Sequence, residues 1–198
     1  MNSLLTLALG FLKNGDLLSA IAKKLNIEEA QVQKILVIAV PLLIQALSKN
    51  VEKKSGADAL FEAISEDHDG SILDDPAGFL NNSTLKEGAG ILKHVLGSQS
   101  KPLAGQLAEL SGVDPKIATE VLGMAAPVVM GALGKMQSEG EVDKGSLSGI
   151  LDAATSMADK QAPGLLGAVK GLLDSDGDGK IDDQIVKMGS SLLSNLFK

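Results

Sequence analysis

The sequence predicts an all-α protein, and three features of the chain support this prediction. Helix-favouring Ala, Leu, Lys, Glu and Gln dominate the segments between turns, whereas runs of β-branched or aromatic residues are scarce. Apolar residues recur at the three- and four-residue spacing of a helix face. With 44% hydrophobic residues among 198 and neither Tyr nor Trp, the chain is expected to fold around an aliphatic core.

The chain begins with an apolar segment, MNSLLTLALGFLKNG, which is expected to form a short buried helix that ends at Asn14-Gly15. This segment has neither the basic start nor the small-residue cleavage site of a secretion signal. The longest apolar run, from Ile35 to Ile44, is about half the length of a membrane span and contains Pro41. We therefore expect no transmembrane segment and a cytoplasmic location.

Capping residues and apolar spacing predict the longer helices. Asp16 is the expected N-cap of a helix that ends at Leu25. A second helix is expected from about Glu28 to Lys49, because apolar residues follow one face throughout this stretch. Asp114 is the expected N-cap of a helix from Pro115 to about Met136, since Pro is favoured in the first turn.

These helices also suggest an internal repeat. Residues 16–50 laid on residues 102–136, at an offset of 86, give eight identities, among them Pro41 with Pro127. Chance matches are common in helices rich in Ala and Leu, but a shared proline is informative because Pro costs about 3 kcal/mol inside a helix. We interpret the pattern as duplicated helical-hairpin units with kinked central helices.

An acidic loop, DSDGDGKIDD, follows the expected duplicated core of residues 1–138 and lies in a C-terminal helical segment, 139–198. Its spacing is typical of a calcium loop, with Gly179 at the sharp turn. The candidate metal ligands are Asp174, Asp176, Asp178, Lys180, Asp182 and Asp183. Ile185 occupies position 12, where a bidentate Glu normally completes the shell, so we expect weak calcium binding. The alternative is a turn whose carboxylates cap the next helix.

A weaker copy of this loop occurs earlier, between Ser65 and Asp75. Its candidate ligands are Asp67, Asp69 and Asp74, and Ser65 replaces the Asp at position 1. The favoured interpretation of this copy is structural: Asp75 caps a short helix that begins with Pro76, and the other carboxylates accept hydrogen bonds in turns.

Composition and charge exclude several classes of function. The net charge is −7, the pI is about 4.8, and all 18 basic residues are Lys, so the chain lacks the Arg contacts that read nucleic acids. A mobility-shift assay at physiological salt should show no specific complex. There is no Cys, and the two histidines, His68 and His94, lie far apart in the sequence. His94 lies beside Lys93 in an amphipathic helix, where a partly exposed structural role is expected. No nucleophile elbow or phosphate-binding loop is present, so we expect no enzyme and no cofactor except calcium.

Several motifs together resemble one bacterial family. They are DHDGSILDD, GILKHVLG from Gly90, APVVMGALGK from Ala126, and the closing DSDGDGKIDD with MGSSLLSNLF. In combination they resemble the YidB-like proteins of unknown function. The resemblance implies an all-helical fold, sometimes described as homeodomain-like, and implies no established activity.

Two functional hypotheses follow. The first is a non-catalytic structural or protein-interaction module, with a protein partner or self-association, whose C-terminal arm is ordered by calcium. The second is a membrane-surface or self-assembling protein that uses its apolar termini. Those termini are Leu4 to Leu12 and a C-terminal stripe formed by Ile185, Met188, Leu192, Leu193, Leu196 and Phe197. Both are more simply interpreted as core faces.

Overall fold

A computed structural model describes residues 3–76, 78–80 and 82–161, and this part of the chain is helical and contains no strand. The all-α prediction is confirmed. The α-helices are α1 (Leu4–Leu12), α2 (Gly15–Leu25), α3 (Glu29–Val51), α4 (Lys54–Glu66), α5 (Asn82–Val95), α6 (Ser100–Ser111), α7 (Pro115–Ser138) and α8 (Leu147–Gln161). Three short 3-10 helices are η1 (Ser71–Leu73), η2 (Gly78–Leu80) and η3 (Gly97–Gln99). The DSDGDGKIDD loop and the C-terminal stripe lie outside the described residues.

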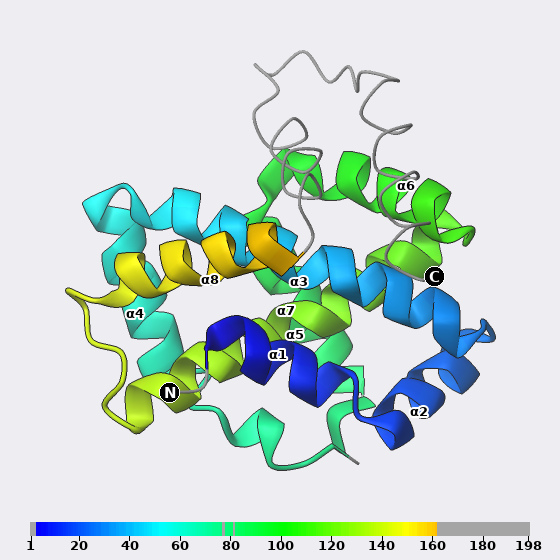
Figure 1. Cartoon of the computed structure of the whole chain (residues 1–198), viewed down its shortest axis with the longest axis horizontal. Helices are drawn as coiled ribbons and strands as arrows, with labels where there is room; N and C mark the ends of the chain where they lie inside the picture. Colours follow the sequence, from blue (N-terminus) through cyan, green and yellow to red (C-terminus); the bar gives the residue numbers. More distant parts are fainter. Residues whose placement is uncertain (1–2, 77, 81, 162–198) are drawn as a thin grey trace.

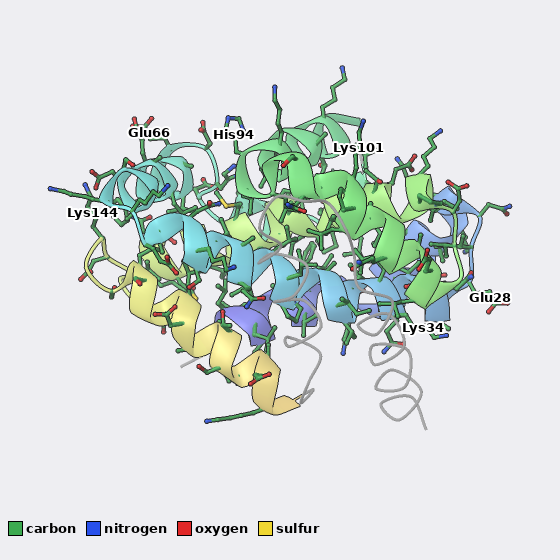
Figure 2. The ribbon with its side chains drawn as sticks, turned by 90° about the horizontal axis from the view of Figure 1, so that it is seen from above. Glu28, Lys34, Glu66, His94, Lys101 and Lys144 are labelled. Atoms are coloured by element: carbon green, nitrogen blue, oxygen red, sulfur yellow. The ribbon has the colours of Figure 1, made fainter. Side chains whose placement is uncertain are left out.

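The two longest helices, α3 and α7, form the centre of the bundle (Figure 1). Fourteen of the 23 residues of α3 and 16 of the 24 residues of α7 are buried. Every other described α-helix packs against at least one of these two. Charged side chains such as Glu28, Lys101 and Lys144 point outward (Figure 2). The outer helices thus cover two central helices that are too apolar to face water.

These two central helices are also long and apolar enough to cross a membrane, as judged by length and composition alone. The bent pair α1 and α2 passes the same test as one broken span. The expectation of no span considered only the run from Ile35 to Ile44, whereas α3 continues through Pro41 to Val51. In the bundle, 72% of the apolar window of α3 and 83% of that of α7 are buried. Neighbouring helices therefore occupy the surface that lipid would contact in a membrane.

The starts of the helices follow from local capping. The Oγ of Ser3 accepts a hydrogen bond from the amide of Thr6 at 3.2 Å and caps α1. The prediction that Asp16 caps α2 is wrong, because Asn14 accepts from the amides of residues 16 and 17 at 3.0 and 3.3 Å. Asp16 lies instead in the first turn, where its negative charge interacts favourably with the positive end of the helix dipole. The predicted cap of α7 is confirmed: Asp114 accepts from the amide of Lys116 at 2.8 Å.

The helices of the two hairpins, α2–α3 and α6–α7, begin at nearly the offset of 86 residues read from the sequence. Helix α6 begins 85 residues after α2, and α7 begins 86 residues after α3. In both hairpins the connecting residue is left-handed, with φ of 54° at Asn26 and 70° at Gly112. Helices α3 and α7 both continue through their internal prolines, Pro41 and Pro127.

Glycines lie where the backbones of α5 and of the residues after α4 come close to α7. A Cβ added at Gly88 of α5 would overlap the backbone carbonyl of Gly123, and one added at Gly134 would overlap that of His68. Because these obstacles are backbone atoms, they cannot move aside as side chains do. The close approach of α5, and of the end of α4, to α7 therefore depends on these glycines.

Helix α8 shares the same core as the helices before it. Its inward residues Leu147, Leu151, Ala154 and Ala158 are buried in the one hydrophobic cluster that includes α1, α3 and α7. At the surface of this contact, the Oγ of Ser48 donates to Asp152 at 2.6 Å. Residues 139–161 therefore pack onto the helices of residues 1–138 as part of one body.

Candidate functional site

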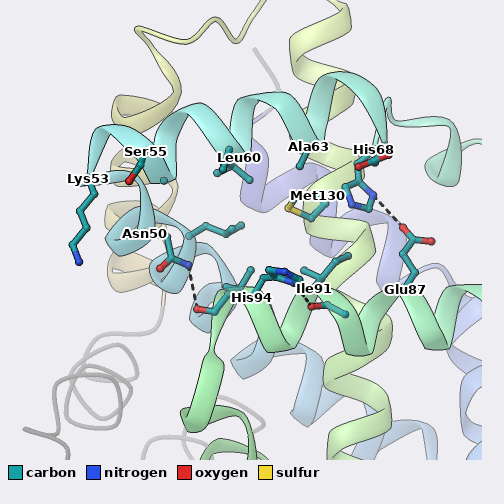
Figure 3. Close-up of a pocket in the computed structure, with 16 residues that line it drawn as sticks. Asn50, Lys53, Ser55, Leu60, Ala63, His68, Glu87, Ile91, His94 and Met130 are labelled. Atoms are coloured by element: carbon teal, nitrogen blue, oxygen red, sulfur yellow. Dashed lines mark hydrogen bonds and ion pairs between the residues drawn. The ribbon is translucent and has the colours of Figure 1, made fainter.

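A groove lies between α4 and α5, two helices that run in opposite directions (Figure 3). Its volume is about 870 Å³. Apolar side chains from α3, α4, α5 and α7 form its floor: Leu47, Leu60, Ala63, Ile91, Val95 and Met130. Polar side chains form its rim: Asn50, Lys53, Ser55, Asp67, His68, Glu87 and His94. An apolar floor with a polar rim is typical of a binding site for an amphipathic ligand.

Each end of the groove is closed by a polar contact. At one end, the side-chain amide of Asn50 donates to the carbonyl of Val95 at 3.1 Å and joins the end of α3 to the end of α5. At the other end, Nδ1 of His68 lies 3.1 Å from a carboxylate oxygen of Glu87, and the His68 side chain is only 12% exposed. The first contact ties α5 to α3, and the second ties the residues that follow α4 to α5, so both sides of the groove are held in place without a ligand.

The charge of the rim changes along the groove. Lys53 lies at the end where α4 begins, and Glu87 lies at the opposite end (Figure 3). Asp67, the C-cap of α4, also lines the groove at that opposite end. Lys53 and Asp67 are exposed, so their charges are available to an elongated ligand. Such a ligand would be oriented by its own charges, because opposite charges at its two ends would match the groove in one direction only.

Both histidines line this one groove, although 26 residues separate them in the sequence. His68 contacts the carboxylate of Glu87, and Nδ1 of His94 lies 2.9 Å from the carbonyl of Gly90 in its own helix. Each contact holds its imidazole ring in place. No local pattern in the sequence could have revealed that the two residues share a groove.

The candidate ligands of the first acidic loop, Ser65–Asp75, make different contacts. Asp69 accepts from the amide of Ser71 at 3.0 Å, and hydrogen bonds from the side chain and backbone of Ser71 lower the pKa of the Asp69 carboxyl. Asp74 lies 3.2 Å from the Nζ of Lys135 on α7. Asp67 is the C-cap of α4 and lines the groove. In the part of the chain that the structure describes, no three His, Asp or Glu side chains gather closely enough to hold a metal ion.

Asp75 is a capping residue, as the structural interpretation of this loop predicted. Its Oδ1 accepts from the amide of Gly78 at 2.9 Å, so the short helix that it caps is η2, which begins two residues after Pro76. The turn before it depends on Gly70, whose φ of 97° brings its backbone against Lys135. The left-handed conformation of this glycine lets the loop lie directly on α7.

The second loop, with Asp174, Asp176, Asp178, Lys180, Asp182 and Asp183, lies outside the described residues. Calcium binding there stays a prediction.

Comparison with known proteins places the chain in a family. Residues 9–136 match DUF937, described as bacterial protein of unknown function. This range contains α2 to α6, all but the last two residues of α7, and every residue that lines the α4–α5 groove. No curated protein and no solved structure matches the chain. As the resemblance to the YidB-like proteins implied, the chain belongs to the DUF937 family of bacterial proteins of unknown function.

Proposed function

We propose that this protein is a non-catalytic interaction module that binds an amphipathic helix in the groove between α4 and α5. The observation that supports this proposal is the apolar floor beneath a polar rim. Elsewhere on the described surface, Met157 is the only large hydrophobic side chain that is exposed. Apolar binding area in this part of the protein is therefore concentrated in the groove.

The dimensions of the groove suit a helix of three to four turns. Ser55 and His68 both line it and are 13 residues apart, which corresponds to about 20 Å along a helix. A helix that offers apolar residues at positions i, i+3, i+4 and i+7 would place them on the floor. The polar face of the same helix would remain at the rim, within reach of its charged groups.

A single tryptophan can test binding, because the chain contains neither Trp nor Tyr. Ala59 lies at the groove and Ala153 lies on α8 away from it, and both are exposed. We expect the emission of an Ala59→Trp variant to shift to shorter wavelength and saturate when a 14-residue amphipathic Leu/Lys helical peptide is titrated. The Ala153→Trp variant should show no such shift. Equal responses from the two variants would contradict the proposal.

A charge on the floor of the groove should weaken this binding. Replacing the half-buried Ala63 with Glu places a carboxylate among apolar side chains, at a cost that exceeds about 1.4 kcal/mol, or tenfold in affinity. We expect peptide affinity to fall at least tenfold, measured by calorimetry. The matched variant Ala153→Glu should bind like the wild type. If Ala63→Glu also retains full affinity, the peptide binds elsewhere.

We also propose that the loop from Asp174 to Asp183 binds calcium weakly, with a dissociation constant of about 10⁻⁵ to 10⁻³ M. Binding to the native state alone should stabilise it by about 2.7 kcal/mol at a hundredfold excess over this constant. Calcium should therefore raise the melting temperature of the wild type relative to chelator. Asp176→Asn with Asp178→Asn should abolish the increase, whereas the control pair Asp67→Asn with Asp69→Asn should retain it. Identical melting of the wild type in calcium and in chelator would disprove the site.

We further infer that the two hairpins arose by duplication. The matching helix ends and the left-handed residues at 26 and 112 support this inference. The groove, however, combines α4 and α5 with both repeated helices, α3 and α7. A single repeat unit would therefore not contain it.

The membrane-surface hypothesis receives less support than the interaction hypothesis. Leu4, Leu5, Ala8 and Leu12 of α1 are at most 1% exposed, so the N-terminal apolar face is used in the core. We expect the folded protein not to bind anionic vesicles in a flotation assay, in keeping with the expected cytoplasmic location. Flotation with the vesicles would favour the membrane hypothesis and give α3 and α7 a second role.

A further inference from the structure

We propose that the helix that occupies the α4–α5 groove is this chain's own C-terminal stripe, residues 185–197, bound within the same molecule. The inference rests on the proposed function, since it names the occupant of the same groove. Apart from this groove, the described helices already pair their apolar faces with one another. The stripe has the matching properties: apolar residues at helical spacing, with acidic residues before it and a lysine after it.

The spacing and length of the stripe fit the groove. Its apolar residues fall at the three- and four-residue intervals that give one helix face: Ile185, Met188, Leu192, Leu193, Leu196 and Phe197. As a helix, residues 185–197 would be about 20 Å long. The groove offers about the same length between Ser55 and His68. The match allows the whole stripe to lie on the apolar floor.

The connection to α8 is long enough for this arrangement. Helix α8 ends at Gln161, so residues 162–184 join it to the stripe. Such a segment can span up to about 75 Å when extended, which exceeds the diameter expected for a protein of this size, whose radius of gyration is about 16 Å. Tethering also gives the stripe an effective concentration on the order of millimolar. The stripe of the same molecule is therefore favoured over that of a second copy.

Charge selects the direction of docking. Asp182 and Asp183 precede the stripe and Lys198 follows it. The groove has Lys53 at one end and Asp67 with Glu87 at the other. Opposite charges meet at both ends only if the stripe runs parallel to α4. In this direction Leu193 lies near Ala63, and Ile185 lies near Ser55.

Disulfide trapping tests both the docking and its direction, because the chain contains no cysteine. The variant Ala63→Cys with Leu193→Cys should oxidise readily to a cross-linked monomer. Ala63→Cys with Ile185→Cys should cross-link at least tenfold more slowly, as should the control Ala153→Cys with Leu193→Cys. Disulfide-linked dimers would overturn docking within one molecule. Equal rates for the test pair and the Ala153 control would overturn docking altogether.

A second measurement separates this inference from the proposed function. Leu193→Asp removes an apolar anchor from the stripe and should release the groove, so the Leu/Lys peptide should bind this variant at least tenfold more tightly than the wild type. Both proteins would carry the Ala59→Trp reporter. Equal affinity for the two would overturn the inference and leave the groove as a peptide-binding site. Absence of binding to either would overturn the proposed function, and the inference with it.

Discussion

Replacing Gly88 with Ala should lower the free energy of unfolding by about 3 kcal/mol, at the upper end of the cost of overpacking a core. The added Cβ would overlap the backbone carbonyl of Gly123, so α5 and α7 would have to move apart. For a chain of this length, the melting temperature should fall by about 6 to 12 °C. Thermal denaturation followed by circular dichroism would measure the change.

The matched control lies two residues away in the same helix. Gly90 is exposed, and a Cβ added there meets no atom within 4 Å. Gly90→Ala should therefore stabilise the protein by about 0.5 to 1 kcal/mol, because Ala favours the helix and restricts the unfolded chain. If both substitutions shift the melting temperature in the same direction, the close packing of Gly88 on Gly123 does not determine the stability change.

Replacing Phe79 with Ala should cost about 3 to 5 kcal/mol, because it removes a large buried side chain and leaves a cavity. Phe79 is 2% exposed, and its ring packs edge-to-face on Phe11 of α1, with 5.5 Å between centroids. This contact holds the segment between α4 and α5 against the bundle. Urea denaturation should show a lower midpoint, and the end of the groove at His68 and Glu87 should exchange its amide hydrogens faster.

An exposed ion pair in the same segment provides the comparison. Asp74 pairs with Lys135 at 3.2 Å, but the Asp74 side chain is 71% exposed. Asp74→Ala should change stability by no more than about 1 kcal/mol, as is usual for surface pairs. Similar losses from Phe79→Ala and Asp74→Ala would show that the segment is held by charge and not by the buried ring.

The helices of this protein could be predicted from local sequence because the signals that define them are local. The ranges expected for α2, α3 and α7 agree with the structure to within about two residues, since apolar spacing and capping residues act over single turns. The cap of α2 shows the limit of such signals. Asn14 and Asp16 are both good N-cap residues, and the helix begins at the earlier one.

The role of the first acidic loop required tertiary contacts. Its sequence allowed either a metal site or a set of turn and capping residues. Asp69 and Asp75 accept hydrogen bonds from nearby amides, as a local pattern can suggest, but the partner of Asp74 is Lys135, 61 residues later. That lysine approaches only because Gly70 lets the loop lie on α7.

By itself, the sequence determined that this chain forms helices, where the main ones begin and end, and that their core is aliphatic. Only the tertiary structure decided that α4 and α5 lie beside each other over α3 and α7, and that His68 and His94 line one groove. The physical reason is the distance along the chain over which each interaction acts. Hydrogen bonds and capping act within a turn, whereas the groove depends on where glycines let distant helices approach and on which apolar faces remain to be covered.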